Sequence, residues 1–287
     1  MFNILDILLL NLTISLVIVG SLITNYEEHV PVFLIKLFRY GSFAYKGKDE
    51  KLFKTIEIPK SYFRHFYVFS AVFSAVTLIY MVSIYFLSFP ANSFVQIFMT
   101  RIFKEEEPKG TMIVGSFNLL TLHCWRRFYE SHKLQVFART SKINLFYYGT
   151  AYVHYAALIL ITVGQAPLFC GKFYIPCIFL FLLASYGQYS SNVVLANLRR
   201  DKTGAVVTEA HKIPRSRMFD SVSSPHRLCE IVLYIVFATL TPTRTMLIMC
   251  LWVFCNQIQS AVHAHEWYKR TFKDYPKNRT AIFPYIL

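Results

Sequence analysis

The feature that most constrains this chain is a series of apolar segments, most of them long enough to cross a lipid bilayer. A crossing helix needs about 20 mostly apolar residues. Only 16% of the 287 residues are charged, against about 25% in soluble domains, and 55% are hydrophobic. The apolar segments cover about 4–24, 66–89, 112–125, 145–169, 173–198 and 229–259.

These segments predict an all-α membrane protein, a bundle of about seven transmembrane helices. The last of them, residues 229–259, is long enough for two crossings if the "TPTRT" at 241–245 forms the turn between them. No linker or low-complexity tract divides the chain, so we expect one polytopic domain over residues 1–287.

The distribution of Lys and Arg predicts how the helices are oriented. The loops at about 25–65, 126–144 and 199–228, and the segment after residue 259, hold 8, 5, 7 and 5 of the 30 basic residues. The alternate loops hold the rest, which are Arg101, Lys104, Lys109, Lys172 and Arg244. Because cytosolic loops carry the excess of Lys and Arg, we expect a lumenal or external N-terminus and a cytosolic C-terminus.

Composition also bears on the partners of the chain. The net charge of +14 indicates contact with anionic groups, either membrane headgroups or an anionic cofactor. Nucleic acid is not expected, because the basic residues do not lie in a soluble domain.

A metal centre is not expected, since His263 and His265 are the only closely spaced histidine pair. Without inverted repeats or paired broken helices, a channel or transporter is disfavoured. The oligomeric state stays open.

Polar residues recur on one face of the segment at 173–198 and just beyond it. Ser185, Gln188, Asn192 and Arg199 follow one another at steps of 3, 4 and 7 residues, which is helical spacing. Such a face either forms hydrogen bonds between helices or is a polar wall that descends from the cytosol into the bundle.

A basic segment at 197–230 follows, with Gly204 and Pro214 as turn residues. Its cations either grip phosphates through charge-assisted hydrogen bonds or touch lipid headgroups. Glu230 lies near the start of the next apolar segment, where a buried carboxylate needs a cation or a hydrogen-bond donor.

Glu57 lies between Ile56 and the pair Ile58–Pro59, at the border of an apolar segment. An acid in such surroundings is a candidate for the neutral form, which can donate a hydrogen bond to a carbonyl. The alternative is an ordinary surface glutamate.

The tail "HEWYKRTFKDYPKNRTAIFPYIL" at 265–287 is rich in aromatic and basic residues. If it is helical, His265, Tyr268, Phe272 and Tyr275 share one face. The tail is therefore either an anchor at the membrane surface or part of a site that faces Asn192 and Arg199.

The motifs of this tail resemble the C-terminal signature of the steroid 5-alpha-reductase family, His-x-x-Tyr, then Phe-x-x-Tyr-Pro, then Arg and a Pro-aromatic ending. The segment "NVVLANLRRDKTGAVVTEAHKIPRSRMFDSVSSPHRLCEI" is similar to the Asn-Leu-Arg, Ile-Pro, Val-Ser and Glu block of the same family. "EIPKSYFRHFY" and "LHCWRRFYE" resemble its polyprenol-reductase branch. The matches cover about 55–70, 120–130 and 185–287.

The resemblance implies a seven-helix reductase that binds NADPH from the cytosol and reduces a carbon–carbon double bond conjugated to a carbonyl. It implies that Glu57 is the acid near the substrate carbonyl, and Tyr268 is a second catalytic candidate. The residues implied to contact or frame the nucleotide are Arg127, Asn192, Arg199, His211, Lys212, His226, Glu230, His265 and Tyr268.

Two positions depart from the family pattern. Cys124 stands where steroid-reducing members pair the acid with a tyrosine, and a thiol is a poor hydrogen-bond donor. His226 stands where an asparagine is usual. The first departure disfavours a steroid substrate.

The branch implies a long-chain isoprenoid lipid as substrate and the endoplasmic reticulum membrane as location. Only an alkene conjugated to a carbonyl accepts hydride readily, because charge then moves onto oxygen. We therefore expect hydride transfer to the beta carbon of polyprenal, a precursor of dolichol for N-glycosylation, with the alcohol polyprenol as the other candidate substrate. Steroid or enoyl-thioester reduction is the alternative within this fold, and a membrane methyltransferase is a more distant one.

Overall fold

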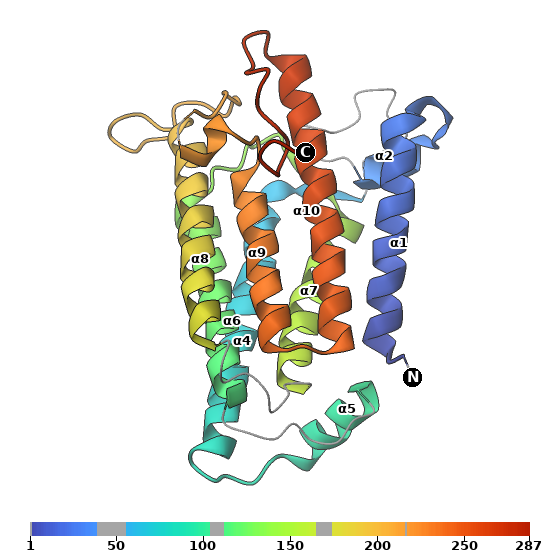
Figure 1. Ribbon diagram of the computed structural model, residues 1–287, viewed down its shortest axis with the longest axis vertical. Coiled ribbons are helices and arrows are strands. Elements are labelled where there is room, and N and C mark those ends of the chain that lie inside the picture. The colour runs from blue at the N-terminus through green and yellow to red at the C-terminus, as the bar shows by residue number, and fades with distance from the viewer. Residues whose placement is uncertain (1, 39–55, 104–111, 165–173, 216) are drawn as a thin grey trace.

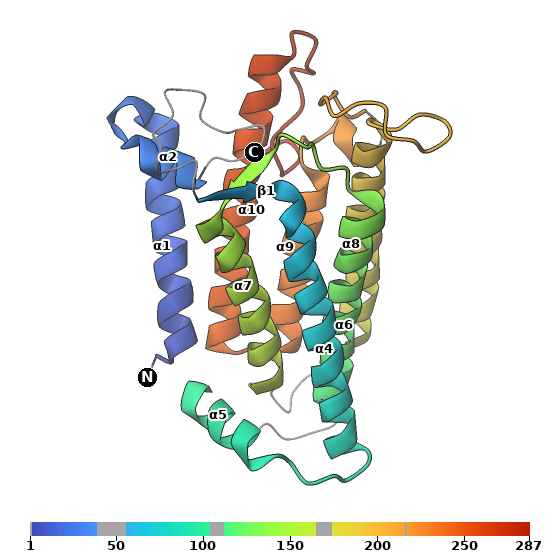
Figure 2. The same cartoon turned by 180° about the vertical axis from the view of Figure 1, so that it is seen from behind.

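The computed structural model describes residues 2–38, 56–103, 112–164, 174–215 and 217–287. Long helices run side by side along the long axis of the molecule (Figures 1 and 2). They are α1 (Ile4–Asn25), α4 (Phe63–Tyr85), α6 (Met112–Tyr129), α7 (Leu145–Gly164), α8 (Tyr174–Asn197), α9 (Pro225–Leu240) and α10 (Arg244–Thr271). The predicted all-helical architecture is confirmed.

Among the described residues, five helices are long and apolar enough to cross a membrane: α1, α4 with the turn before it, α7, α8 and α10. The other two predicted crossings, α6 and α9, lie in the same bundle but do not meet that criterion. α9 has 16 residues, which at about 1.5 Å per residue is shorter than a hydrocarbon core of about 30 Å. Its packing between α8 and α10 explains this, because a helix surrounded by protein need not match the bilayer.

The predicted turn at 241–245 is confirmed. α9 ends at Leu240 and α10 begins at Arg244. Thr243 caps the new helix, and its hydroxyl accepts a hydrogen bond from the Met246 amide at 3.3 Å.

Short elements lie at the two ends of the bundle. One end carries α2 (Val32–Phe38) and two strands, β1 (Glu57–Pro59) and β2 (Lys142–Asn144), with the 199–224 segment and the tail after residue 271 (Figures 1 and 2). We call this the loop end. The opposite end carries the N-terminus and α5 (Ser93–Phe103). The described residues also form short turns at Glu27–His29, Lys60–Tyr62, Glu130–Leu134 and Arg217–Asp220.

The predicted alternation of basic and less basic loops agrees with this arrangement where the chain is described. Arg101 and Arg244 lie at the end of the N-terminus, and the described parts of the four basic segments lie at the loop end. Lys104, Lys109, Lys172, residues 39–55 and residues 165–169 of the predicted fourth crossing lie outside the described residues.

Close packing of α8 on α9 positions the polar face of α8. Gly187 faces Cys229 so closely that a Cβ atom at residue 187 would lie 2.8 Å from the cysteine sulfur. α4 packs on α6 and α1 packs on α10. At the far end, Arg244 contacts the buried Asp6 carboxylate at 2.9 Å and ties α1 to α10.

The loop end is held by an antiparallel pairing of β1 and β2. Glu57 pairs with Asn144, Ile58 with Ile143 and Pro59 with Lys142. This pairing joins the segment before α4 to the segment before α7, and so fixes the entry of two bundle helices.

Candidate active site

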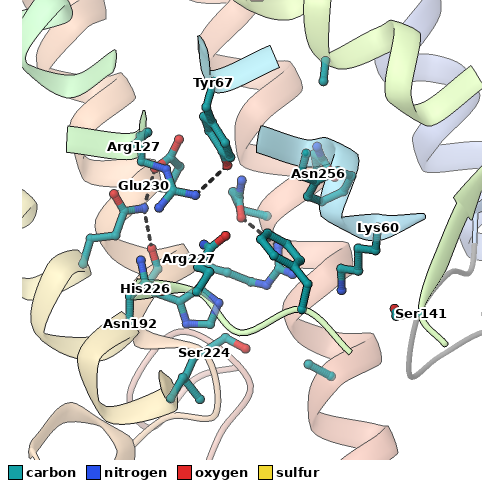
Figure 3. Close-up of a pocket in the computed structure, with 18 of the residues that line it drawn as sticks. Lys60, Tyr67, Arg127, Ser141, Asn192, Ser224, His226, Arg227, Glu230 and Asn256 are labelled. Atoms are coloured by element: carbon teal, nitrogen blue, oxygen red, sulfur yellow. Dashed lines mark hydrogen bonds between the residues drawn. The ribbon is translucent and has the colours of Figure 1, made fainter. Parts of the chain in front are cut away.

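A cavity of about 450 Å³ lies at the loop end, among α4 and α6–α10. This volume lies in the range of about 300–1,000 Å³ that is typical of ligand sites. Figure 3 shows part of its lining, with Tyr67, Arg127 and Glu230 drawn toward a shared space. The lining includes Lys60, Tyr67, Arg127, His154, Tyr155, Gln188, Asn192, Arg199, His211, Lys212, Ser224, His226, Arg227, Glu230, Tyr234, Trp252, Asn256 and Tyr268.

The lining has an excess of positive charge. Among the described residues it holds five Lys and Arg side chains but one carboxylate, that of Glu230. Four of these cations lie at the loop end: the Lys60 and Lys212 ammonium groups and the Arg199 and Arg227 guanidinium groups. The fifth, Arg127, belongs to α6. A concave cationic surface of this kind suits an anionic ligand.

A buried carboxylate organises the wall formed by α6 and α8. Glu130 is fully buried, in a π-helical turn that follows α6. Its oxygens accept hydrogen bonds from Arg126 at 2.5 Å, from Arg127, and from the Asn192 amide at 2.9 Å. A buried carboxylate is stable only with such partners. The Arg-Arg-x-x-Glu spacing places both guanidinium groups within reach of the acid.

Arg127 joins this network to α4. Its other terminal nitrogen donates a hydrogen bond to the Tyr67 hydroxyl at 2.7 Å, drawn as a dashed line in Figure 3. The guanidinium also lies 5.0 Å from the centre of the Tyr67 ring. A tyrosine on one helix and an arginine on another are therefore held together at the cavity wall.

Gln188 connects the Arg126 side of the network to α9. Its amide oxygen accepts from Arg126 at 2.5 Å, and its amide nitrogen donates to Glu230 at 2.5 Å and to the His226 carbonyl at 3.1 Å. The second oxygen of Glu230 lies 3.8 Å from His123 Nε2. These bonds supply the partner that the sequence required for Glu230.

The mouth of the cavity is formed by the segment after α8. Arg199 donates to the Val136 carbonyl at 2.5 Å and to His211 Nε2 at 3.0 Å. His211 also meets the Trp267 ring edge-on at 5.1 Å. Desolvation, followed by the charges of Arg199 and Lys60, lowers the pKa of His211 to about 4, so this imidazole is neutral at pH 7.

Most of the residues predicted for the site come together around this cavity. Its lining contains Arg127, Asn192, Arg199, His211, Lys212, His226, Glu230 and Tyr268. The predicted polar face of α8 contributes Gln188 and Asn192, and Arg199 follows just after the helix ends. Ser185 is buried on the same helix, outside the described lining.

Glu57 does not lie in the described lining. It sits in β1 with 35% of its side chain exposed, and its carboxylate pairs with Lys142 at 3.5 Å. Cys124 is also outside the lining, because it is fully buried in the core of the bundle.

His265 fastens the tail and does not contribute to the described lining. Its Nδ1 lies 2.7 Å from the Ser223 hydroxyl. That hydroxyl also contacts the Tyr275 hydroxyl at 2.5 Å and donates to the Thr280 carbonyl at 3.0 Å. His265 therefore supports the site from behind, while Tyr268, three residues later, faces the cavity.

The expected continuous helical face in the tail is wrong in part. α10 ends at Thr271, and Phe272 is extended. Pro276 lies shortly beyond, where it cannot continue a helix. The rings still gather, because Tyr268 stacks on Phe272 at 5.8 Å and on Tyr275 at 5.5 Å after the chain turns back.

Several lining or supporting residues were not singled out from the sequence. Tyr67 is one of 19 tyrosines and Glu130 one of 16 acidic residues, so type alone does not distinguish them. The spacing of Glu130 after two arginines was a usable signal. His154 and Tyr234 are 80 residues apart, and their contact, at 2.5 Å between His154 Nε2 and the Tyr234 hydroxyl, has no local signal.

Comparison with known proteins agrees with the resemblance. A family model described as 3-oxo-5-alpha-steroid 4-dehydrogenase matches residues 132–287. A polyprenal reductase of Drosophila melanogaster is 37% identical over 99% of this chain and 94% of its own length. A polyprenal reductase of Ailuropoda melanoleuca is 30% identical over 87% of this chain and 85% of its own length. A polyprenal reductase of Homo sapiens is 30% identical over 81% of this chain and 79% of its own length. The chain therefore belongs to the steroid 5-alpha-reductase family.

Proposed function

We propose that this protein is a membrane-bound polyprenal reductase. It reduces the double bond next to the aldehyde of a long-chain polyprenal, and the electrons come from NADPH. The proposal rests on the relatives named polyprenal reductase, which align with most of the chain. It also rests on the character of the cavity, which has a cationic mouth and aromatic walls.

The lining fits an anionic dinucleotide. Five cations and one carboxylate line the described cavity. The Nδ1 atom of His226 is buried, and the described residues offer it no hydrogen-bond partner. A buried nitrogen of this kind needs a partner, and a polar ligand in the cavity can supply one. Arg199, Lys212 and Arg227 would hold phosphates, and Asn192, His226, Glu230 and Tyr268 would frame the remainder.

The aromatic residues suit the lipid part. Phe63, Phe66, Tyr155, Tyr234 and Trp252 line the cavity on the side of α4, α7, α9 and α10. An allylic isoprene unit presents mostly apolar surface with one carbonyl oxygen, so it requires apolar walls and few donors.

The chemistry is a two-electron reduction. When bound, NADPH would supply the hydride for the beta carbon, and a proton would be added at the alpha carbon. The chain must exclude water, orient the aldehyde and stabilise the negative charge that develops on its oxygen. The saturated aldehyde is the product, and a separate enzyme is needed to make the alcohol.

We also propose that the loop end faces the cytosol and that the membrane is the endoplasmic reticulum. The basic segments at the loop end support the first assignment. The family resemblance supports the second.

The decisive experiment uses purified protein in detergent with NADPH, and follows absorbance at 340 nm. We expect oxidation of NADPH on addition of polyprenal and none with polyprenol. Turnover of a 3-oxo-4-ene steroid in place of polyprenal would move the protein to the steroid-reducing branch. Turnover of polyprenol alone would refute the aldehyde mechanism.

A further inference from the structure

The proposed reaction needs a hydrogen-bond donor for the aldehyde oxygen, and the expected acid, Glu57, lies outside the described lining. Its carboxylate pairs with Lys142. Cys124, which stands where steroid-reducing relatives have a tyrosine, is fully buried in the core. We therefore look for the donor among the residues that line the cavity. Tyr268 is one of them, but the proposed function places it against the cofactor.

We propose that Tyr67, activated by Arg127, is the catalytic residue that donates this hydrogen bond. This assignment rests on the proposed reduction of polyprenal. Tyr67 lines the cavity from α4, and 8% of its surface is exposed. It offers a phenolic hydroxyl on the helix that packs directly against α6, the helix of Cys124.

The hydrogen bonds around Tyr67 leave its proton available. Arg127 donates to the phenolic oxygen at 2.7 Å, so the oxygen acts as an acceptor in this contact. Within the described part of the chain, no acceptor is recorded for the phenolic proton. A tyrosine hydroxyl both donates and accepts, and the donor half is therefore free for a ligand oxygen.

The guanidinium makes Tyr67 a better donor. A cation that donates to the phenolic oxygen withdraws electron density from it, which strengthens the O–H group toward an acceptor. Arg127 is in turn held by the buried Glu130, and Glu130 is held by Arg126 and Asn192. The donor is thus fixed in position before the substrate arrives, which is the condition for effective stabilisation of a developing oxyanion.

The ring of Tyr67 packs among other aromatic rings. It lies against Phe66 with ring centres 4.5 Å apart and against Tyr155 at 5.9 Å. Apolar surroundings of this kind lower the local dielectric constant, which strengthens a hydrogen bond to an oxygen that gains charge. No net proton transfer from Tyr67 is needed, because the phenol only shares its proton while the negative charge resides on the substrate oxygen.

The first test compares Tyr67→Phe with Glu57→Gln and with Tyr152→Phe. Tyr152 is the matched control, since its ring also packs on Phe66, at 6.3 Å, but it does not line the described cavity. We expect Tyr67→Phe to lower kcat by about 100-fold, the usual effect of removing one such donor. NADPH binding should change little, and Tyr152→Phe should retain its activity. A collapse in Glu57→Gln with normal turnover in Tyr67→Phe would overturn the assignment in favour of Glu57.

The second test observes the carbonyl directly. Polyprenal bound with NADP⁺ cannot be reduced, so the stretching frequency of its carbonyl reports the hydrogen bond alone. We expect a lower frequency in the wild-type protein than in Tyr67→Phe. Replacement of Tyr67 by 3-fluorotyrosine keeps the shape of the side chain and makes it a stronger hydrogen-bond donor, so it should lower the carbonyl frequency further. Because this variant retains the hydroxyl, it also controls for a folding defect in Tyr67→Phe.

The outcomes separate this inference from the proposed function. If the wild-type protein does not reduce polyprenal, the proposed function fails before Tyr67 is tested. If the wild-type protein is active and the carbonyl frequency is the same in Tyr67→Phe, the inference fails alone. Weaker NADPH binding in Tyr67→Phe with an unchanged carbonyl frequency would place Tyr67 against the cofactor and refute its role at the aldehyde.

Discussion

The Glu130 network offers a prediction whose size can be worked out from the structure. Glu130→Gln removes the negative charge that Arg126 and Arg127 share, while the side chain keeps nearly the same shape. The carboxylate is fully buried, and the Arg126 and Arg127 side chains are 17% and 12% exposed. The substitution therefore leaves two largely desolvated cations without their counter-ion.

Removing one partner of a buried ion pair costs about 3–5 kcal/mol of stability. The partial exposure of the two arginines favours the lower part of this range. A domain somewhat smaller than this chain shifts its Tm by about 2–4 °C per kcal/mol. We therefore expect Glu130→Gln to lower Tm by roughly 6–12 °C, measured by thermal unfolding of the detergent-solubilised protein.

Glu209→Gln is the matched control. Glu209 pairs with Arg139 at 3.8 Å, and the Arg139 side chain is 95% exposed. Exposed pairs contribute about 0–1 kcal/mol, so this variant should unfold within a few degrees of the wild-type protein. If Glu130→Gln were no less stable than Glu209→Gln, the buried network would not have the importance that we assign to it.

A double variant tests the physical cause. Arg126→Gln combined with Glu130→Gln removes an uncompensated cation together with the acid. We expect the pair to cost less than the sum of the single changes, which is the signature of direct coupling. Additive effects would refute it.

Three further predictions concern the mouth and the orientation of the bundle. Lys212→Gln should weaken NADPH binding by about tenfold and reduce the salt dependence of that binding, as expected for a phosphate-binding cation. Lys202→Gln is the control, because Lys202 lies in an exposed turn outside the described lining and its loss should not weaken binding. Equal effects in titrations of the two variants would refute a specific contact. His211 has a pKa of about 4, and a bound phosphate would raise this pKa, so a proton is taken up when NADPH binds. As the pH falls from about 7.5 to 5.5, the affinity of the wild-type protein for NADPH should therefore rise relative to that of His211→Gln. A constant ratio of the two dissociation constants would refute this linkage. In sealed microsomes, the cysteine of Lys202→Cys should react with an impermeant maleimide, whereas that of Asn92→Cys should react only after the membrane is permeabilised. The reverse pattern would invert the proposed orientation.

The helices and their order could be predicted because they depend on local properties of the chain. An apolar run of bilayer length must form a helix in lipid, since each backbone polar group then has a partner within the same segment. The turn between α9 and α10 was predictable for a similar reason, because a capping threonine, a proline and an arginine interrupt the apolar run. The polar face of α8 follows from helical spacing alone.

The opposing sides of the site depend on contacts between distant segments, and local pattern does not predict them. Tyr67 and Arg127 are 60 residues apart, and Asn192 and Glu130 are 62 apart. Helical spacing shows which residues share a face, but not which face of another helix they meet. The location of Glu57 depends on the pairing of β1 with β2, because Lys142 reaches it across that pairing.

The sequence by itself therefore determined a helical membrane protein with a basic end, and through its motifs a family and several of the residues that line the described cavity. Only the tertiary structure decided which of these groups touch the cavity and which support it from behind, as His265 does through Ser223. The physical reason is that hydropathy and helical period act within one segment. The hydrogen bonds that join Arg127 to Tyr67 and Glu130 to Asn192 depend on how α4, α6 and α8 pack.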